Sequence, residues 1–336
     1  MNKLLSICIP TYNRREFLRS NLLEIIDQAN EANLQDYIEI CISDNASSDN
    51  TSTMIKDLCK DHSNIDIIYS DNKSNVGPER NFIIVMKMAT AKYSWLLGSD
   101  DMLGKHSLIS ISKELSNDNF DILLFNRNNY DKSMKTFISQ SYFLRPHIES
   151  QIFDFKDPIQ EKIYLNNAQT LGAVFSYISS IIYRTDIVRE NPFDESFFTI
   201  AYPHAYYFFK CIKSGGKLKY QREPFINNRL GNDSFGSGYK RKLLDYNGYN
   251  FIRNKFYNND DNEIDFMRIL KSEHPFFSLI EMCCEMKKKE WLELTPILIL
   301  SGWTEIELKH IELISNTPNM YRSKFKQWLK KALRKN

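Results

Sequence analysis

Short runs of aliphatic and β-branched residues alternate with amphipathic, helix-length segments throughout the first 125 of the 336 residues. Strands that alternate with helices form crossover units, and repeated units place parallel strands side by side with helices on both faces. The sequence therefore predicts an α/β fold with a mainly parallel sheet flanked by helices. We expect strands at 4–9, 37–43, 65–70, 93–98 and 121–125 and helices near 14–30, 51–62, 78–90 and 105–116.

The pattern changes after the fifth expected strand. A polar, aromatic-rich stretch at 127–170 predicts loop and short helix without a definite element. FSYISSIIY at 175–183 predicts a strand, and AYYFFKCIKSGGK at 205–217 predicts a helix that ends at paired glycines. From about residue 238 the pattern is helical, and we expect helices at 239–258, 262–288, 290–300, 304–315 and 320–334.

These patterns indicate two regions. We expect an α/β domain over 1–236, with a first half at 1–125 and a second half at 126–236. The boundary follows the glycine-bearing stretch GNDSFGSG, because glycine-rich segments interrupt periodic structure. An all-helical extension is expected at 237–336.

Charge and cysteine usage exclude several classes of protein. The 44 Lys and Arg residues nearly balance the 42 Asp and Glu residues, which argues against a surface devoted to nucleic acid. The six cysteines form no CxxC pair, which favours reduced residues in a reducing compartment. The N-terminal apolar stretch is only six residues long, and no run reaches the ~18 apolar residues that span a bilayer. We therefore expect a cytoplasmic protein, or one peripheral to a membrane on its cytoplasmic side.

Polar residues gather directly after four of the expected strands. In an open parallel sheet the ligand binds outside the carboxyl ends of the strands, so these positions are candidates for a site. Asn, Asp, Ser and Gly are also ordinary turn residues, but their recurrence at successive strand ends favours a site. The segments are PTYN at 10–13, SDNASSDNT with Asp44, SDNKSNVGPERN with Arg80 and Asn81, and GSDD with Asp100 and Asp101.

Adjacent aspartates after a strand are candidate metal ligands. Mg²⁺ and Mn²⁺ bind through one or two carboxylates together with water and substrate phosphates. A divalent ion at Asp100 and Asp101 would neutralise charge that develops on a departing nucleotide diphosphate. The alternative is that this pair forms only a helix cap and a turn. Asp44 could likewise cap a turn or accept a hydrogen bond from a nucleobase N–H.

LLSICIPTYNRREFL, IEICISDNASSDNT, NVGPERN and WLLGSDD together resemble, in order and spacing, the nucleotide-sugar half of a family 2 glycosyltransferase with the GT-A fold. The resemblance covers roughly residues 4–110 and implies that Asp100 binds the ribose and that Asp101 ligates the metal. The family pattern has an aspartate where this chain has Ser99, so a metal contact through one carboxylate is expected. The residues that the resemblance assigns to the nucleotide are Pro10, Thr11, Tyr12, Asn13, Asp44, Arg80 and Asp100.

A second resemblance is narrower. LGAVFSYISSIIY, AYPH and RLGNDSFG, which begin at positions 171, 201 and 229, resemble abequosyltransferases. The resemblance implies transfer of a 3,6-dideoxyhexose such as abequose from a CDP donor. The implied acceptor is an undecaprenyl-diphosphate-linked oligosaccharide of O-antigen, in lipopolysaccharide biosynthesis. It leaves open whether the anomeric configuration is inverted or retained.

His204 occupies the position of the catalytic base in the family pattern. Most members place an aspartate at the start of a helix about eleven residues before a glycine, and the same count back from Gly215 reaches His204. A neutral imidazole with a pKa near ~6.5 can accept a hydroxyl proton at cytoplasmic pH. A structural role at the helix start and a hydrogen bond to the acceptor stay open. Asp194 and Glu195 are the nearest alternative carboxylates, or else form a surface turn.

RLGNDSF lies where many relatives have a polar loop that closes over the diphosphate. Asn232, Asp233 and Ser234 are the candidate residues of this loop. Arg229 is a candidate for the pyrophosphate, because a guanidinium matches phosphate oxygens, although a surface salt bridge is equally open. Gly231 stands where relatives can have a histidine metal ligand, so a third protein ligand is not expected.

The C-terminal segment YRSKFKQWLKKALRKN has seven Lys and Arg residues, no acidic residue, and apolar residues at helical spacing. Such a basic amphipathic helix binds the surface of an anionic membrane. The cytoplasmic surface of the inner membrane is the expected partner, and a solvated terminal helix is the alternative.

The sequence therefore favours a metal-dependent glycosyltransferase that binds a nucleotide-sugar donor and a lipid-linked acceptor, with no nucleic-acid partner. A non-catalytic nucleotide-sugar or carbohydrate-binding subunit of a polysaccharide assembly complex is the alternative. Metal-dependent hydrolysis of the donor would separate the two.

Overall fold

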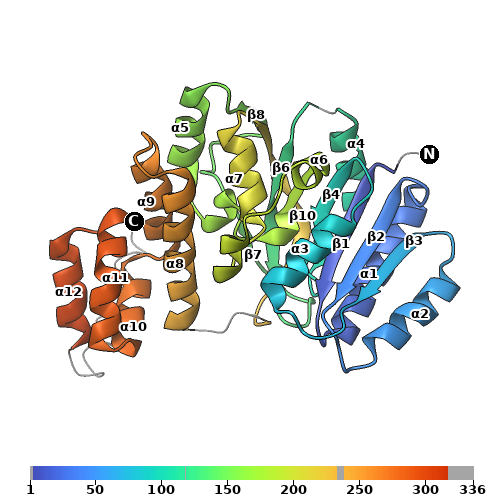
Figure 1. Cartoon of the computed structure of the whole chain (residues 1–336), viewed down its shortest axis with the longest axis horizontal. Coiled ribbons are helices and arrows are strands. Elements are labelled where there is room, and N and C mark those ends of the chain that lie inside the picture. Colours follow the sequence, from blue (N-terminus) through green and yellow to red (C-terminus); the bar gives the residue numbers. More distant parts are fainter. Residues whose placement is uncertain (1–2, 118, 233–237, 317–336) are drawn as a thin grey trace. The chain divides into compact units, whose positions relative to one another are not determined.

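The structure, a computed structural model, describes residues 3–117, 119–232 and 238–316. The chain divides into two compact units, Met1–Asp233 and Ser234–Asn336. A mixed sheet with flanking helices makes up the described part of the first unit, and helices make up that of the second (Figure 1).

The five strands expected in the first 125 residues are present. β1 (Leu5–Thr11) and β2 (Ile38–Asp44) are buried along their whole length, as expected for strands covered on both faces. The other strands are β3 (Asp66–Asp71), β4 (Tyr93–Leu96), β5 (Met102–Leu103), β6 (Ile122–Tyr130), β7 (Phe137–Ser141), β8 (Gln151–Asp154), β9 (Ile181–Arg184) and β10 (Lys217–Arg229).

The described strands form one sheet in the order β3-β2-β1-β4-β9-β6-β10-β5, with β7 paired to β6 and β8 paired to β10. β3, β2, β1 and β4 are parallel to one another, as the crossover pattern predicts. β9 is antiparallel to β4 and β6, while β6 and β10 are parallel to each other. The sheet is therefore parallel over its first four strands and mixed beyond them.

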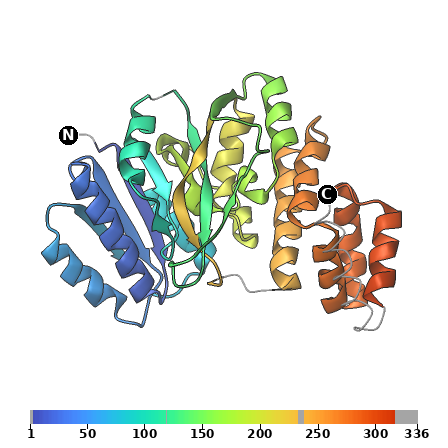
Figure 2. The same cartoon turned by 180° about the vertical axis from the view of Figure 1, so that it is seen from behind.

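Helices cover the sheet in two layers. α1 contacts α2 and α4, whereas α3 contacts α6, which in turn contacts α7. The chain moves from β1 through β2 to β3 in one direction across the sheet, and α3 then carries it back past β1 to β4. Because crossovers are right-handed, a connection that runs in the reverse direction places its helix on the opposite face of the sheet. Figures 1 and 2 show the two faces. The helices of this unit are α1 (Arg15–Glu31), α2 (Thr51–Asp61), α3 (Pro78–Met88), α4 (Ser107–Ser116), α5 (Pro158–Asn167), α6 (Asp186–Arg189) and α7 (Ala205–Lys213).

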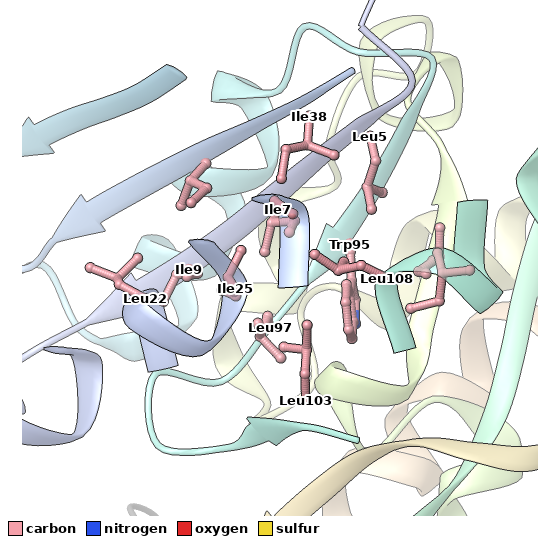
Figure 3. Packing of buried hydrophobic residues seen from close by; sticks show 14 of the residues in the cluster. Leu5, Ile7, Ile9, Leu22, Ile25, Ile38, Trp95, Leu97, Leu103 and Leu108 are labelled. Carbon is pink, nitrogen blue, oxygen red and sulfur yellow. The ribbon is translucent and has the colours of Figure 1, made fainter. Parts of the chain in front are cut away.

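The main core of this unit lies between β1 and α1. Leu5, Ile7 and Ile9 alternate along β1 and belong to one buried cluster with Leu22 and Ile25 of α1 (Figure 3). Each such side chain contributes roughly 1.5–3 kcal/mol when it is fully removed from water. This packing fixes the carboxyl end of β1, where the candidate site begins.

The expected strand at 175–183 is mostly wrong. The segment contains two 3-10 turns, η1 (Leu171–Val174) and η2 (Ile178–Ser180), and only then enters β9. Phe175 between the turns has a φ of 70°, which breaks an extended chain. The β-branched composition predicted a strand, but side-chain contacts described below hold this segment in turns.

The second half of the unit contains strands that the sequence pattern did not reveal. β7 and β8 lie within the stretch at 127–170, where only loop and short helix were expected, and the short helix α5 lies there too. The helix expected at 205–217 ends at Lys213, and Gly215 has a φ of 79°, so Lys217 already begins β10. β10 is long and polar, and for this reason its composition does not suggest a strand.

The second unit contains a succession of helices, as expected. The helix expected at 262–288 is divided at Pro275, which lacks the backbone N–H that would continue α9 and instead precedes the first residue of α10. None of the described helices is both long and apolar enough to cross a bilayer. The expected helix at 320–334 lies outside the described residues. The helices are α8 (Tyr239–Phe256), α9 (Glu263–Glu273), α10 (Phe276–Glu285), α11 (Lys288–Leu300) and α12 (Glu305–Ser315).

Candidate functional site

The candidate site begins where the winding of the sheet reverses. β1 pairs with β2 on one side and with β4 on the other, and all three strands are parallel. Their carboxyl ends therefore lie at one edge of the sheet, which is where ligands bind in open α/β sheets. The structure thus brings together the polar segments that follow these strands.

Asp44 and Thr11 lie side by side at this edge, as register partners on β2 and β1. Both are buried. The Asp44 carboxylate accepts hydrogen bonds from the Ser47 N–H at 3.0 Å and from the Tyr69 hydroxyl at 2.9 Å. The Thr11 hydroxyl has no hydrogen-bond partner among the described residues. A buried carboxylate beside a hydroxyl with unused bonding capacity can recognise a polar ring such as a nucleobase.

Pro10, Tyr12 and Asn13 shape the segment around β1. Pro10 is the buried penultimate residue of the strand, whereas the Tyr12 side chain is 45% exposed. Asn13 has a left-handed φ of 49°, and its side chain accepts a hydrogen bond from the Ser48 N–H at 2.8 Å. This contact joins the loops that follow β1 and β2, and it leaves the Tyr12 ring open to solvent.

Arg80 lies on α3, near its N-terminus. Its guanidinium carbon is 4.2 Å from the ring centroid of Phe198. Among the described residues no carboxylate forms an ion pair with it. The exposed guanidinium is therefore available to an anionic ligand. The neighbouring Asn81 is buried and bonded to Ser43, so it fixes α3 to β2 instead.

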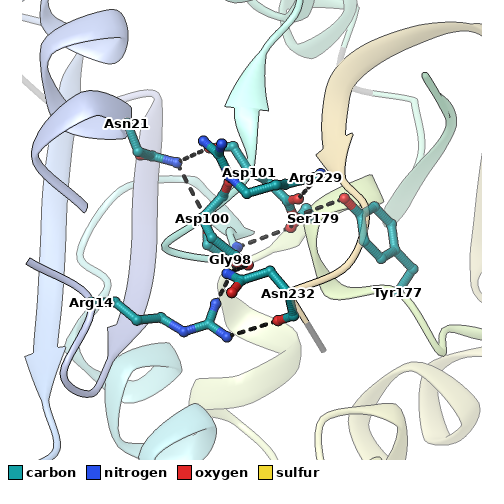
Figure 4. Close-up of polar contacts among 9 residues, drawn as sticks. All are labelled: Arg14, Asn21, Gly98, Asp100, Asp101, Tyr177, Ser179, Arg229 and Asn232. Atoms are coloured by element: carbon teal, nitrogen blue, oxygen red, sulfur yellow. Dashed lines mark hydrogen bonds and ion pairs between the residues drawn. The ribbon is translucent and has the colours of Figure 1, made fainter. Parts of the chain in front are cut away.

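Asp101 is buried and bonded on several sides (Figure 4). Its Oδ2 accepts hydrogen bonds from the Tyr177 hydroxyl at 2.7 Å and the Ser179 hydroxyl at 2.5 Å. Its backbone carbonyl accepts a hydrogen bond from the Asn21 side chain on α1. Burial and the neighbouring Asp100 raise the pKa of Asp101 to about 6, although the hydrogen bonds oppose the shift.

The donor set at Asp101 is compatible with a divalent ion. Its Oδ1 receives only a long contact, 3.4 Å, from the Arg229 N–H, so one carboxylate oxygen retains capacity for a ligand. Within the described ranges, no group of three His, Cys, Asp or Glu side chains is placed to hold a metal. Mg²⁺ and Mn²⁺ do not need such a cage, because they usually bind one or two carboxylates plus substrate phosphates. The residues present therefore fit a metal that is shared with a phosphorylated ligand.

Asp100 has different partners from Asp101. Its carboxylate pairs with Arg14 at 2.6 Å and accepts a hydrogen bond from the Asn232 side chain at 2.6 Å (Figure 4). The Arg229 guanidinium donates to the backbone carbonyls of Asp100 and Lys132, at 3.0 and 2.6 Å. Arg14, Arg229 and Asn232 therefore hold the turn that carries both aspartates.

The loop that follows β10 is described in part. The Asn232 side chain donates a hydrogen bond to the Asp100 carboxylate. Gly231 has a φ of 76°, and an added Cβ would meet nothing within 4 Å. Asp233 and Ser234 lie outside the described residues.

His204 lies at the start of α7 and is 1% exposed. Its Nε2 lies 2.7 Å from the Phe175 carbonyl oxygen and donates to it, which leaves Nδ1 unprotonated in the neutral ring. Nδ1 is buried and has no hydrogen-bond partner among the described residues. The ring lies among the aromatic rings of Phe82, Tyr202 and Phe208. Burial lowers the pKa of His204 to about 4, so the imidazole is neutral at pH 7.

The carboxylate alternatives to His204 are placed in a turn. The Asp194 side chain accepts hydrogen bonds from the N–H and hydroxyl of Ser196, at 2.9 and 2.6 Å. Asp194 thus caps the short 3-10 helix η3 (Glu195–Thr199), and Glu195 is its exposed first residue.

Several residues of the site were not foreseen from the sequence. Tyr177 and Ser179 lie in the segment expected as a strand, and nothing local indicates that they bond Asp101. Asn21 had a usable signal, because it is a polar residue among Leu18, Leu22 and Ile25 on the buried face of an amphipathic helix. For Arg14, the only signal in the sequence was its position next to PTYN.

Comparisons of the sequence with known proteins give two matches. A family model described as glycosyl transferase family 2 matches residues 6–190, more than half of the chain. The abequosyltransferase RfbV of Salmonella typhimurium is 35% identical over 309 residues, which cover 89% of this chain and 90% of RfbV.

Two solved structures are similar in fold. S. aureus TarS has a TM-score of 0.62 and 16% sequence identity, and the match covers 93% of this chain and 53% of that one. This chain therefore spans about half the length of that TarS chain. Mannosyltransferase PcManGT from Pyrobaculum calidifontis, in complex with GDP-Man and Mn²⁺, has a TM-score of 0.52 and 12% identity, with coverage of 94% and 86%. At these identities the likeness concerns the fold alone.

Proposed function

The chain belongs to glycosyl transferase family 2, and from this premise we propose that it transfers a 3,6-dideoxyhexose such as abequose from a CDP donor. The acceptor in this proposal is an O-antigen oligosaccharide on undecaprenyl diphosphate. The observation that carries the proposal is the 35% identity with RfbV over 89% of the chain, which extends beyond the nucleotide-binding half. The chain is thus a family 2 enzyme with a GT-A-like fold, and the donor and acceptor are the proposed part.

The nucleotide would bind along the edge formed by β1, β2 and β4. Asp44 and Thr11 would recognise the base, with the exposed Tyr12 ring beside it and Pro10 and Asn13 shaping the segment. Asp100 would bind the ribose in exchange for its bond to Asn232. Arg80, which has no acidic partner among the described residues, would lie near the phosphates. This assignment is supported by the buried but incompletely bonded groups at the edge.

Asp101 would hold a divalent ion, Mn²⁺ or Mg²⁺, through Oδ1. When bound, such an ion neutralises charge on the leaving diphosphate. Tyr177 and Ser179 orient the carboxylate by binding Oδ2, so that Oδ1 faces the ligand. PcManGT, which is similar in fold, is described in complex with GDP-Man and Mn²⁺, and this supports a divalent ion in the proposal.

In the transfer, the acceptor hydroxyl forms a bond to the anomeric carbon. The bond from that carbon to the β-phosphate oxygen breaks, and its electron pair stays on the diphosphate. If the configuration is inverted, the hydroxyl proton passes to a general base, for which we propose His204 Nδ1. This atom is unprotonated at pH 7 because Nε2 carries the proton bonded to Phe175.

The transferase domain in this proposal spans 1–236, and the helical region at 237–336 contacts the membrane. The basic segment at 321–336, outside the described residues, would bind the cytoplasmic surface of the inner membrane. This places the enzyme beside a lipid-linked acceptor.

The test is isothermal titration with CDP, UDP, GDP and dTDP, each with and without Mn²⁺, followed by a transfer assay with the nucleotide sugar that matches. We expect cytidine-selective, Mn²⁺-dependent binding. Asp101→Asn should remove the Mn²⁺ dependence and lower transfer by roughly 100-fold or more, because a metal contributes several kcal/mol. Asp27→Asn is the control, since Asp27 is an exposed carboxylate on α1.

Tight binding of a different nucleotide would contradict the CDP donor while keeping a transferase. Binding of none of the four, or nucleotide binding without transfer, would contradict the proposed reaction. Retained Mn²⁺ dependence in Asp101→Asn would remove Asp101 from the metal site.

A further inference from the structure

Arg127 lies beside Asp101 on a part of the sheet that the sequence did not associate with the site. It stands on β6, in register with Ile226 of β10 and Ser141 of β7. Its guanidinium carbon is 4.1 Å from the ring centroid of Tyr177. Tyr177 in turn donates its hydroxyl to Asp101, so Arg127 is one side chain removed from the carboxylate.

The charge of Arg127 reaches the site. It acts on both Asp101 and Tyr177, and it opposes the effects of burial and of Asp100 on the pKa of Asp101. No ion pair or side-chain hydrogen bond of Arg127 occurs among the described residues, and its Nε is buried without a partner. An incompletely bonded cation in partly buried surroundings costs stability, because its lost contacts with water are not replaced.

Other arginines of the first unit are bonded differently. Arg14 pairs with Asp100, Arg184 with Asp186, and Arg222 with Glu149. The Arg229 guanidinium is held by two backbone carbonyls. Arg127 differs from these four and resembles Arg80, because its guanidinium lies over an aromatic ring and forms no ion pair among the described residues.

We propose that Arg127 binds the diphosphate of the donor beside Asp101. The donor diphosphate carries two negative charges and gains another as it leaves, which is more than one divalent ion neutralises. The planar guanidinium matches phosphate oxygens with two parallel N–H donors. The Tyr177 ring packs against the guanidinium. This inference rests on the proposed function for the presence of a diphosphate, and it concerns the diphosphate rather than the base or the sugar.

The experiment compares the affinities for CDP and CMP by isothermal titration at one fixed concentration of Mn²⁺, so that the metal is the same for the wild type and every variant. The variants are Arg127→Gln and Arg127→Lys. Arg222→Gln is the matched control, because Arg222 is also a strand arginine near a tyrosine ring, with its centroid 5.6 Å away, but is paired with Glu149.

We expect Arg127→Gln to weaken CDP binding by roughly 10- to 100-fold and to leave CMP binding almost unchanged, since charge-assisted hydrogen bonds are lost. The affinity of Arg127→Lys for CDP should fall between those of the wild type and the glutamine variant, because lysine keeps the charge but not the two parallel N–H donors. Arg222→Gln should bind both nucleotides as the wild type does.

An unchanged ratio of CDP to CMP affinity in a folded Arg127→Gln variant would overturn the inference. If that variant does not fold, NMR of the arginine side-chain Nε–H groups in the wild type tests the inference instead. The Arg127 signal, assigned by its absence from Arg127→Lys, should move with CDP and not with CMP, and an unmoved signal would overturn the inference.

Failure of the proposed donor has a different signature. If the wild type binds UDP, GDP or dTDP instead of CDP, the same comparison is made with that nucleotide and its monophosphate. If the wild type binds no diphosphate, the proposed function and this inference both fail. Equal diphosphate binding by the wild type and the variant would reject the role of Arg127 and leave the proposed function unaffected.

Discussion

His204 is a buried neutral imidazole in aromatic surroundings, whichever chemical role it has. Its Nε2–H donates a hydrogen bond to the carbonyl of Phe175, the residue with a left-handed backbone between the two 3-10 turns. Those turns carry Tyr177 and Ser179, which hold Asp101. A structural contribution of His204 can therefore be measured separately from catalysis.

The stability of the protein should depend on pH through His204. Its pKa is about 4 in the folded protein and near ~6.5 in the unfolded chain, so the unfolded state binds more protons between these values. The free energy of unfolding should fall by up to roughly 3 kcal/mol as the pH decreases from about 6.5 to about 4. Above pH 6.5 this contribution should not change. Urea unfolding at pH 7.5 and pH 5.0 measures it.

Gln in place of His204 can still donate a hydrogen bond to the Phe175 carbonyl but does not titrate. His204→Gln should therefore reduce the loss of stability between these two pH values. The control is His147→Gln, because His147 is exposed. Equal pH dependence in wild type and His204→Gln would contradict a buried, depressed His204. In the transfer assay, an unchanged rate for His204→Gln at saturating acceptor would reject the base role.

At the scale of elements, the turn between β4 and β5 is the most constrained part of the site. Gly98 begins this turn and donates its N–H to the Ser179 hydroxyl at 2.9 Å. A Cβ at Gly98 would lie 3.0 Å from Asp101 Oδ2 and 3.2 Å from Ser179 Oγ. The turn and the 3-10 segment therefore approach each other as closely as a glycine permits.

Gly98→Ala should displace the Asp101 carboxylate and lower Mn²⁺-dependent nucleotide binding by about tenfold, with a loss of stability of roughly 1–3 kcal/mol from overpacking. Gly98→Val should lower both further. Titration calorimetry and urea unfolding measure the two effects. Wild-type affinity in Gly98→Val would show that the turn adjusts without moving Asp101.

The elements of the nucleotide half were predictable because their signals are local. The strands that precede Asp44 and Asp101 and the helices between them follow from periodicity. The 3-10 segment was predicted as a strand because its composition is β-branched and aromatic, whereas its conformation depends on bonds to Asp101 from 76 and 78 residues away. β10 was missed because its few buried apolar residues lie among many charged and polar ones, so no alternation marks it as a strand.

At the scale of the whole molecule, the helical region is the proposed membrane-binding part. Removal of residues after 318 deletes the basic segment but leaves every residue of the candidate site in the chain. The truncated protein should bind anionic liposomes more weakly, by about 1 kcal/mol for each cation that lies near the surface. Nucleotide binding should not change. Co-sedimentation with anionic and neutral vesicles measures the difference, and equal pelleting of both forms would contradict the membrane role.

The sequence by itself determined the class of fold, the strands and helices of the first 125 residues, and the family. It also located Asp44, Asp100 and Asp101 at one edge, since parallel strands bring their carboxyl ends together. These features depend on local periodicity and on short motifs, which indicate structure and family without knowledge of distant residues.

The tertiary structure decided which distant side chains meet those aspartates. Tyr177 and Ser179 bind Asp101, Arg14 and Asn232 bind Asp100, and the antiparallel β9 brings the first pair into place. Such contacts depend on strand order and direction, which are set by non-local pairing and packing rather than by periodicity. The position of Arg127 beside Asp101 belongs to this second kind of information, because no local pattern relates a residue on β6 to a turn after β4.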